Sequence, residues 1–229
     1  MKASSIKRPS SRARRRPGSQ VSLAEHVYES FKRDIISGVY KPGEALSENI
    51  LGKRYATSRT PVREAAVRLE RENLVRIVPK KGYFVKLISV SELNELYEYR
   101  ALIECGAAEL AAAKNHDADL LQELASAAAV KYEVGNRASY ARFIEADTAF
   151  HVGIARLAGN QLLIDAVADL RAHMERILYA AINVGDYSEV LTREHAAICD
   201  AIKKRDRDAA RTLMLGHVMK SREKLLQLM

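Results

Sequence analysis

The stretch that decides the fold reads Ser58-Arg59-Thr60-Pro61-Val62-Arg63-Glu64-Ala65-Ala66. It predicts a short helix, because Ser58 or Thr60 can cap its first turn and Pro61 is tolerated there, where its missing N–H has no intrahelical partner. The small apolar residues of the stretch form a narrow face that can pack against a preceding helix. The two arginines lie one turn apart, so both can enter a DNA major groove together.

The flanking segments complete the pattern of a winged helix-turn-helix. An apolar stripe of Leu23, Val27, Phe31 and Ile35 predicts a helix at 21–37 that ends at Gly38, and Ser47 can cap a second helix. After the quoted stretch, residues 74–78 and 83–87 are expected to form a hairpin, the wing, whose tip is Lys80-Lys81-Gly82.

The charged residues of this pattern suit duplex DNA. A recognition helix contacts base edges with its N-terminal residues, and the arginine fork matches O6 and N7 of guanine, which assigns base contacts to Arg59 and Arg63. Thr60 and the N–H groups of the first turn suit phosphate oxygens, and Lys80 and Lys81 lie where a wing meets the backbone or minor groove. An ordinary solvated face is the alternative. The cap, the proline, the paired arginines and the basic wing agree with one another, however, which favours DNA binding.

Charge is divided unevenly along the 229 residues. Residues 1–90 carry 20 Lys and Arg against 8 Asp and Glu, whereas residues 91–229 carry 17 against 21. A basic first half and a mildly acidic second half indicate a polyanion-binding module joined to a domain with another task. With 48% hydrophobic residues the chain can bury one large core or two modest ones, and we place the domain boundary between residues 88 and 89.

The remaining composition bounds the location of the protein. Residues 1–20 are basic, rich in Ser and Pro and nearly free of large apolar side chains, which predicts a disordered arm that either adds phosphate contacts or is a solvated tail. Cys105 and Cys199 form no CxxC motif, and no apolar run reaches the roughly 18 residues that a membrane span needs. We therefore expect a cytoplasmic protein with no membrane partner, bound to the nucleoid when it binds DNA.

Two further segments extend the quoted motif: Gly38-Val39-Tyr40-Lys41-Pro42-Gly43-Glu44-Ala45-Leu46-Ser47-Glu48 before it and Lys81-Gly82-Tyr83-Phe84-Val85 after it. Together they make residues 22–88 resemble the N-terminal domain of the GntR family of bacterial transcriptional regulators. The resemblance implies that the two arginines read bases, that Ser58 and Thr60 hold phosphate and that Gly82 lies at the wing tip. Asn49 stands where many relatives have a further basic residue, so no DNA contact is assigned to it.

The second half is helical by pattern. Apolar residues at helical spacing predict six helices at 91–113, 117–134, 138–157, 161–183, 187–203 and 206–227. The predicted fold is therefore mainly α. A winged helix-turn-helix at 21–88 precedes an all-α six-helix bundle at 89–229, which we expect to bind an effector and to dimerise.

Four ionisable residues of the predicted bundle point inward: Asp147, His151, His195 and His217. Asp147 and His151 leave the same helix face, and each of the other two follows an apolar residue one turn before it. A single buried histidine is more often a core residue that bonds a backbone carbonyl. Three imidazoles and a carboxylate facing one core instead suit a divalent metal such as Zn²⁺, Ni²⁺ or Mn²⁺, because an unpaired ionisable group there is costly.

These residues belong to a longer pattern: Arg100-x-x-x-Glu104, Asp147-x-x-Phe150-His151, Gly159-Asn160, Glu194-His195 and His217. The pattern is similar to the FCD ligand-binding domain of the FadR subfamily of GntR regulators. In its metal-containing members one Asp and three His at these positions hold a divalent ion that binds a small carboxylate. The six-helix count resembles the VanR-type branch, which argues against an acyl-CoA ligand. By position Arg100 and Asn160 would contact the effector; a salt bridge and a helix cap are their alternative roles.

Together these patterns predict a metabolite-responsive DNA-binding transcriptional regulator, with repression as the expected mode. We expect a homodimer on a pseudo-palindromic operator, since one small helix reads few base pairs, and a small organic or sugar-acid carboxylate as effector. Two other classes stay open: a helical metal-dependent hydrolase fused to a DNA-binding domain, and a metal-free architectural DNA-binding protein. An enzyme is disfavoured because a fourth protein ligand leaves less open coordination and no separate general base stands out.

Overall fold

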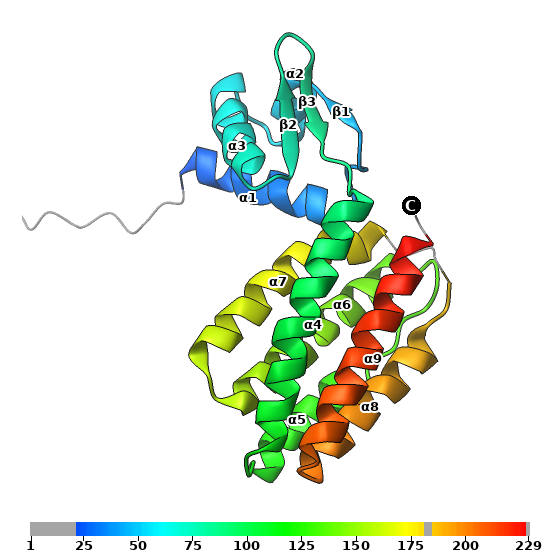
Figure 1. Cartoon of the computed structure of the whole chain (residues 1–229). Coiled ribbons are helices and arrows are strands. Elements are labelled where there is room, and N and C mark those ends of the chain that lie inside the picture. The colour runs from blue at the N-terminus through cyan, green and yellow to red at the C-terminus, as the bar shows by residue number, and fades with distance from the viewer. Residues whose placement is uncertain (1–21, 181–184, 228–229) are drawn as a thin grey trace, which may run out of the picture.

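A computed structural model describes residues 22–180 and 185–227 (Figure 1). Within these ranges the chain forms a small head, residues 22–88, and a larger helical bundle that starts at residue 89. No helix of the described ranges is long and apolar enough to cross a membrane. The predicted arm at 1–20 lies outside them. The elements of the head are α1 (Leu23–Ile36), β1 (Ala45–Leu46), α2 (Glu48–Arg54), α3 (Arg59–Arg71), β2 (Val75–Val78) and β3 (Gly82–Val85).

The helices of the head begin and end where their capping residues stand. Ser22 accepts a hydrogen bond from the N–H of Glu25 at 3.1 Å, and Ser47 accepts one from the N–H of Ile50 at 3.2 Å. α1 ends before Gly38, whose φ of +68° favours glycine. Leu23, which the predicted stripe includes, is exposed. The buried core of the head includes Val27, Phe31, Ile35, Leu51, Val62, Leu69 and Val85.

The wing belongs to a three-stranded antiparallel sheet with the order β1-β3-β2. β2 and β3 form the predicted hairpin, in which Val75 pairs with Val85. β1 is two residues long and pairs with β3, so that Leu46 lies opposite Tyr83. The sequence prediction omits β1, because two residues are too few to show an alternating pattern.

Six helices make up the described part of the bundle, which confirms the predicted fold class. The helix α5 (Ala118–Ala128) ends before the predicted residue 134, because the following residues form a connection around Tyr132. The N–H of Tyr132 donates to Ser188 Oγ at 3.0 Å, and its hydroxyl donates to the carbonyl of Gly185 at 3.1 Å. These bonds satisfy polar groups outside a helix. The helices are α4 (Val90–Ala112), α5 (Ala118–Ala128), α6 (Arg137–Ala158), α7 (Gln161–Ala180), α8 (Ser188–Lys203) and α9 (Arg207–Leu226).

α4 is the helix around which the bundle is arranged. It starts at Ser89, which accepts a hydrogen bond from the N–H of Glu92 at 3.0 Å, and it runs from the head along the length of the bundle (Figure 1). It contacts α6, α7, α8 and α9, with α9 lying along its side. Polar residues on its inner face, Arg100 and Glu104, are therefore buried among four other helices.

One buried arginine joins the bundle to the segment that leads to the head. Arg176 on α7 donates to the carbonyl of Lys86 at 2.9 Å and to Oε1 of Glu92 at 3.1 Å. The predicted domain boundary falls in this segment, between β3 and α4. Because α7 also contacts α1, the head is held by α7 as well as by the chain connection.

Candidate DNA interface and metal-binding site

The exposed face of α3 carries the residues that the sequence assigns to DNA. Ser58, Arg59, Thr60 and Arg63 are all exposed, while the opposite face of the helix lies in the core of the head. Ser58 occupies the N-cap position with an extended backbone, but its side chain makes no capping hydrogen bond to a described residue. The first turn of α3 thus presents hydroxyl groups, N–H groups and Arg59 to solvent, and Arg63 follows one turn later.

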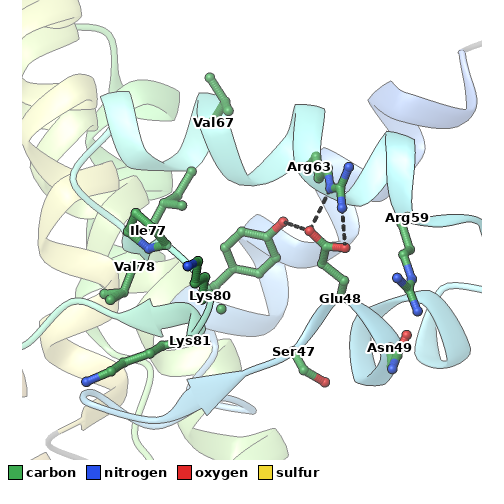
Figure 2. Close-up of a pocket in the computed structure, with 13 residues that line it drawn as sticks. Ser47, Glu48, Asn49, Arg59, Arg63, Val67, Ile77, Val78, Lys80 and Lys81 are labelled. Atoms are coloured by element: carbon green, nitrogen blue, oxygen red, sulfur yellow. Dashed lines mark hydrogen bonds and ion pairs between the residues drawn. The ribbon is translucent and has the colours of Figure 1, made fainter.

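Glu48, the first residue of α2, holds Arg63 in place (Figure 2). Arg63 Nε donates to Glu48 Oε1 at 2.6 Å and Nη2 donates to Oε2 at 3.0 Å, while the Tyr83 hydroxyl donates to Oε1 at 3.2 Å. The hydrogen bond from Arg63 lowers the pKa of Glu48, so the carboxylate stays ionised. Because Glu48 uses the Nε edge of the guanidinium, the edge formed by Nη1 and Nη2 remains for a base. Sequence reasoning missed Glu48, since no spacing links it to α3.

A groove of about 620 Å³ lies between α3, the start of α2 and the wing. Arg59, Arg63, Lys80 and Lys81 line it, and Figure 2 draws no interaction between Arg59 and the other residues shown. Lys80 has a φ of +63°, which lets the chain turn tightly at the tip, and both lysines are exposed. Four cationic side chains along one groove suit the phosphates of a duplex.

Gly82 has a structural role at the wing. Its φ is +103°, and a Cβ at this position would lie 2.6 Å from the carbonyl oxygen of Leu46. A side chain would therefore force β1 away from β3. Glycine lets the wing close on β1, which fixes where the two lysines of the tip lie.

The four predicted metal ligands come together inside the bundle. Asp147 and His151 lie on α6, His195 on α8 and His217 on α9, and all four side chains are buried. One ring nitrogen from each histidine lies within 4.8 Å of the other two. Asp147 Oδ1 is 3.4 Å from His195 Nε2 and 3.8 Å from His151 Nε2. The structure therefore contains a histidine triad that could hold a metal ion, with a carboxylate beside it.

Two buried arginines contact this cluster. Arg171 on α7 donates to Oδ2 of Asp147. Arg100 on α4 donates from Nη2 to His151 Nε2 at 3.0 Å and to His217 Nε2 at 3.3 Å. Its Nε donates to Glu104 at 2.9 Å, which is the salt bridge that the sequence left as an alternative role. Arg100 thus places a cation between two histidine nitrogens.

These contacts orient the rings of two histidines. Arginine only donates, so Nε2 of His151 and Nε2 of His217 each present a lone pair. His217 Nδ1 forms a hydrogen bond with Oε2 of Glu194 at 3.0 Å, whereas His151 Nδ1 lies 3.0 Å from Oε2 of Glu104 but forms no hydrogen bond with a described residue. Burial lowers the pKa of His151 to about 4 and holds the pKa of His195 well below its ordinary value. An imidazole whose second nitrogen is hydrogen-bonded to a carboxylate, as in His217, is oriented to ligate a metal.

The donor set fits a borderline divalent ion. His195 Nε2 is buried without a hydrogen bond to any described residue, and its ring stacks on Phe150 with 4.0 Å between centroids. A buried nitrogen without a partner is costly, which is expected of a ligand atom that a metal would satisfy. Burial opposes the charged form of Asp147, but the guanidinium of Arg171 outweighs it and keeps the pKa of Asp147 below the ordinary value. Three imidazoles and a carboxylate suit Zn²⁺, Ni²⁺ or Mn²⁺.

A small cavity of about 60 Å³ lies beside the cluster, enough for a few water molecules. Its polar lining residues are Arg100, Asp147, His217, Ser221 and Lys224, and its other walls are aromatic rings and leucines. Sequence reasoning missed the last two. The signal was available, because they follow His217 on the same face of one helix.

Asn160, the other predicted effector contact, lies elsewhere. It is exposed at the start of α7, where its Oδ1 accepts hydrogen bonds from the N–H groups of Leu162 at 3.0 Å and Leu163 at 3.4 Å. It therefore acts as the helix cap that the sequence left as its alternative role. Of the two predicted effector contacts, the structure brings only Arg100 to the cavity.

Comparisons with known proteins agree with this division of the chain. Residues 23–85 match the family of bacterial regulatory proteins, gntR family, and residues 95–220 match the FCD domain. The HTH-type transcriptional repressor RspR of Escherichia coli K12 is 30% identical over 89% of each chain. The HTH-type transcriptional repressor GlaR of the same strain is 32% identical over 84% of this chain and 90% of its own. The solved structure of E. coli McbR/YncC has the same fold, with a TM-score of 0.69, 24% identity and coverage of 91% of this chain and 99% of that chain.

An exposed arginine-bearing helix beside a basic wing, followed by an all-helical domain, defines a DNA-binding transcriptional regulator. The chain belongs to the GntR family of bacterial regulatory proteins and carries an FCD domain as its second half. The predicted family and fold class are thereby confirmed. The assignment to the VanR-type branch stays a prediction.

Proposed function

We propose that the protein is a cytoplasmic, metabolite-responsive repressor whose bundle binds a divalent metal ion and a small carboxylate. The observation that carries this proposal is the position of Arg100. Its guanidinium lies between the Nε2 atoms of His151 and His217, beside a third histidine nitrogen without a hydrogen-bond partner among the described residues. A buried site whose lone pairs already stabilise one cation is suited to another.

The histidine triad and Asp147 would hold the ion, which would supply positive charge for a carboxylate oxygen. Arg100 Nη2 lies where two of the histidine nitrogens would have to meet that ion. Its guanidinium must therefore turn away when they do. Because Arg100 also lines the cavity, it can then bind the effector carboxylate through its planar fork.

The cavity limits the size and character of the effector. Its volume of about 60 Å³ admits a small acid. Tyr140 donates its hydroxyl to the carbonyl of Leu178 at 2.9 Å, and Tyr132 donates its own to Gly185 at 3.1 Å. Since these hydroxyls are already bonded, the walls offer apolar ring surface, which favours an organic acid over a hydroxyl-rich sugar acid.

The head would act as one half of a homodimer on a pseudo-palindromic operator. α3 carries Arg59 and Arg63, both exposed, within its first two turns, so one head reads few base pairs and a second supplies the rest of the specificity. RspR and GlaR are both named as repressors, which supports repression as the mode of this protein.

α7 offers a path from the cluster to the head. It carries Arg171, which pairs with Asp147, and Arg176, which bonds the carbonyl of Lys86 and the carboxylate of Glu92. A change in the pairing of Arg171 therefore acts on the helix that holds the head. By linkage, an effector that prefers one position of the head changes operator affinity, and the operator changes effector affinity by the same factor.

We infer that the bundle site binds its ligand without transforming it. Both buried acids beside the histidines are paired with arginines, Glu104 with Arg100 and Asp147 with Arg171. Neither carboxylate is available as a general base for a hydrolytic water.

The decisive experiment compares His195→Ala with wild type and with His173→Ala, a control that removes an exposed histidine of α7. Metal analysis after purification without chelator should find a near-stoichiometric divalent ion in wild type and control and none in His195→Ala. The ion should stabilise wild type by about 2.7 kcal/mol at a hundredfold excess over its Kd. Carboxylates should change operator affinity in wild type only when metal is present. Wild-type protein that neither retains nor takes up a divalent ion refutes the proposal.

A further inference from the structure

Lys224 is a charged residue of the cavity to which the proposed function gives no role. His217, Ser221 and Lys224 recur at helical spacing on α9 and line the same cavity. The Ser221 hydroxyl lies 2.7 Å from the hydroxyl of Tyr97 and accepts a hydrogen bond from Arg100 Nη1 at 3.4 Å. One face of α9 thus runs from the histidine triad to an ammonium group.

The ammonium of Lys224 is buried, and the nearby carboxylate of Glu194, which favours its charged form, does not reach it with a hydrogen bond or salt bridge. Its Nζ is shielded from solvent and makes no hydrogen bond to any residue that the structure describes. The ring of Tyr187 lies 4.5 Å from Nζ, a contact that stabilises a cation weakly. Burial lowers the pKa of Lys224, as expected for a cation kept from water. An anion bound here would remove a cost that the protein alone does not offset.

The other charges around the cavity are already matched. Both buried arginines have a carboxylate partner, on Glu104 and on Asp147. Glu194 is bound by the exposed Lys220 at 3.1 Å. Lys224 has no such partner in the described chain, and a divalent ion at the histidines would add further positive charge. One carboxylate therefore offsets one of the three positive charges carried by Lys224 and a divalent ion, whereas two carboxylates offset two of them.

We propose that the effector is a dicarboxylate and that Lys224 binds its second carboxylate, while the first lies at the histidine triad and Arg100. This inference rests on the proposed function, because that function supplies the first carboxylate site. The ring surfaces of the cavity wall lie along the hydrocarbon chain between the two acid groups. Lys224 then selects diacids over monoacids and sets the chain length that fits.

Calorimetric titration of metal-loaded protein with straight-chain dicarboxylates from malonate to adipate, and with monocarboxylates of the same lengths, tests this assignment. Wild type should bind at least one diacid about ten to a hundred times more tightly than its monoacid. Lys224→Met should lose that preference by weakening the diacid alone, because methionine keeps the apolar stem. Lys220→Met is the matched control, since it removes a lysine from the same helix whose side chain bonds Glu194 and is exposed.

Each outcome decides the matter. Wild type that binds monoacids as tightly as diacids overturns the dicarboxylate inference and leaves the proposed function standing. The role of Lys224 is overturned if Lys224→Met still prefers diacids. It is also overturned if the variant binds diacids and monoacids more weakly by the same factor. Metal-loaded wild type that binds no acid of either series overturns both proposals. Should Lys224→Met lower the melting temperature, Lys224→Gln and Lys224→Arg are titrated instead, and only the arginine variant should keep the preference.

Discussion

The head and the bundle carry the same kind of charged residue in opposite environments. Arg59 and Arg63 lie on an exposed helix face of the head, where water solvates them before DNA binds. Arg100 and Arg171 in the bundle are each 1% exposed, and a carboxylate holds each of them. Exposed functional charges are stable in the unliganded protein because water solvates them, whereas buried functional charges need a protein partner until a ligand binds.

This difference distinguishes the DNA-binding surface of the head from the candidate ligand site of the bundle. DNA binding adds contacts to groups of the head that only water or one acid contacted before. Ligand binding in the bundle must instead exchange one partner for another, and each exchange moves a side chain on a helix. Arg100 lies on α4, which leads into the head, and Arg171 lies on α7, which bonds the connecting segment through Arg176. In the proposed function, ligand binding in the bundle therefore acts on the helices that lead to the head.

The largest expected effect concerns the stability of the bundle. Asp147→Ala removes the partner of Arg171 and leaves a guanidinium buried and unpaired, which should lower the free energy of unfolding by about 3 to 5 kcal/mol. Chemical denaturation of metal-free protein measures the change. Asp169→Ala removes an exposed carboxylate of α7 and should change it by less than about 0.5 kcal/mol. Equal stability of Asp147→Ala and Asp169→Ala would contradict the view that the buried arginines depend on their carboxylate partners.

A smaller effect is expected in the head, on DNA binding alone. Arg59→Ala should cost about 1 to 3 kcal/mol on a duplex selected in vitro and relax the base preference at one position per half-site. Lys81→Ala should weaken selected and random duplexes alike, because a lysine at the wing tip is expected to contact phosphates. Fluorescence anisotropy with the selected and the random duplex distinguishes the effects of the two substitutions on affinity. Equal losses on selected and random DNA for Arg59→Ala would contradict base reading.

Interactions between residues close in the sequence could be predicted, whereas interactions between residues far apart in the sequence could not. The helices are predictable because caps such as Ser47 and breaks such as Gly38 act within a few residues, and the inward faces of successive helices bring the histidine triad together. Pairs between helices leave no spacing to recognise. Arg171 with Asp147 is such a pair, and so is Glu48 with Arg63. Each pair appears only in the packed structure, since Arg171 and Glu48 alone resemble ordinary surface charges in the sequence.

Glu48→Ala should have the smallest effect. It tests the comparison between head and bundle, because Arg63 belongs to the head and yet is paired with a carboxylate, as the bundle arginines are. The Arg63 side chain is 62% exposed, so solvent screens this pair and the midpoint of chemical denaturation should not move. Binding to random DNA should strengthen, since an acid leaves the phosphate-facing groove. Discrimination should fall, because Arg63 no longer starts from one fixed orientation. We therefore expect the ratio of the affinity for selected DNA to the affinity for random DNA to drop by up to about tenfold.

Glu64→Ala is the control. It removes an exposed acid of α3, the helix that carries Arg63, and should leave that ratio unchanged. If both variants behave alike, Glu48 is an ordinary surface charge, and the helix alone orients Arg63.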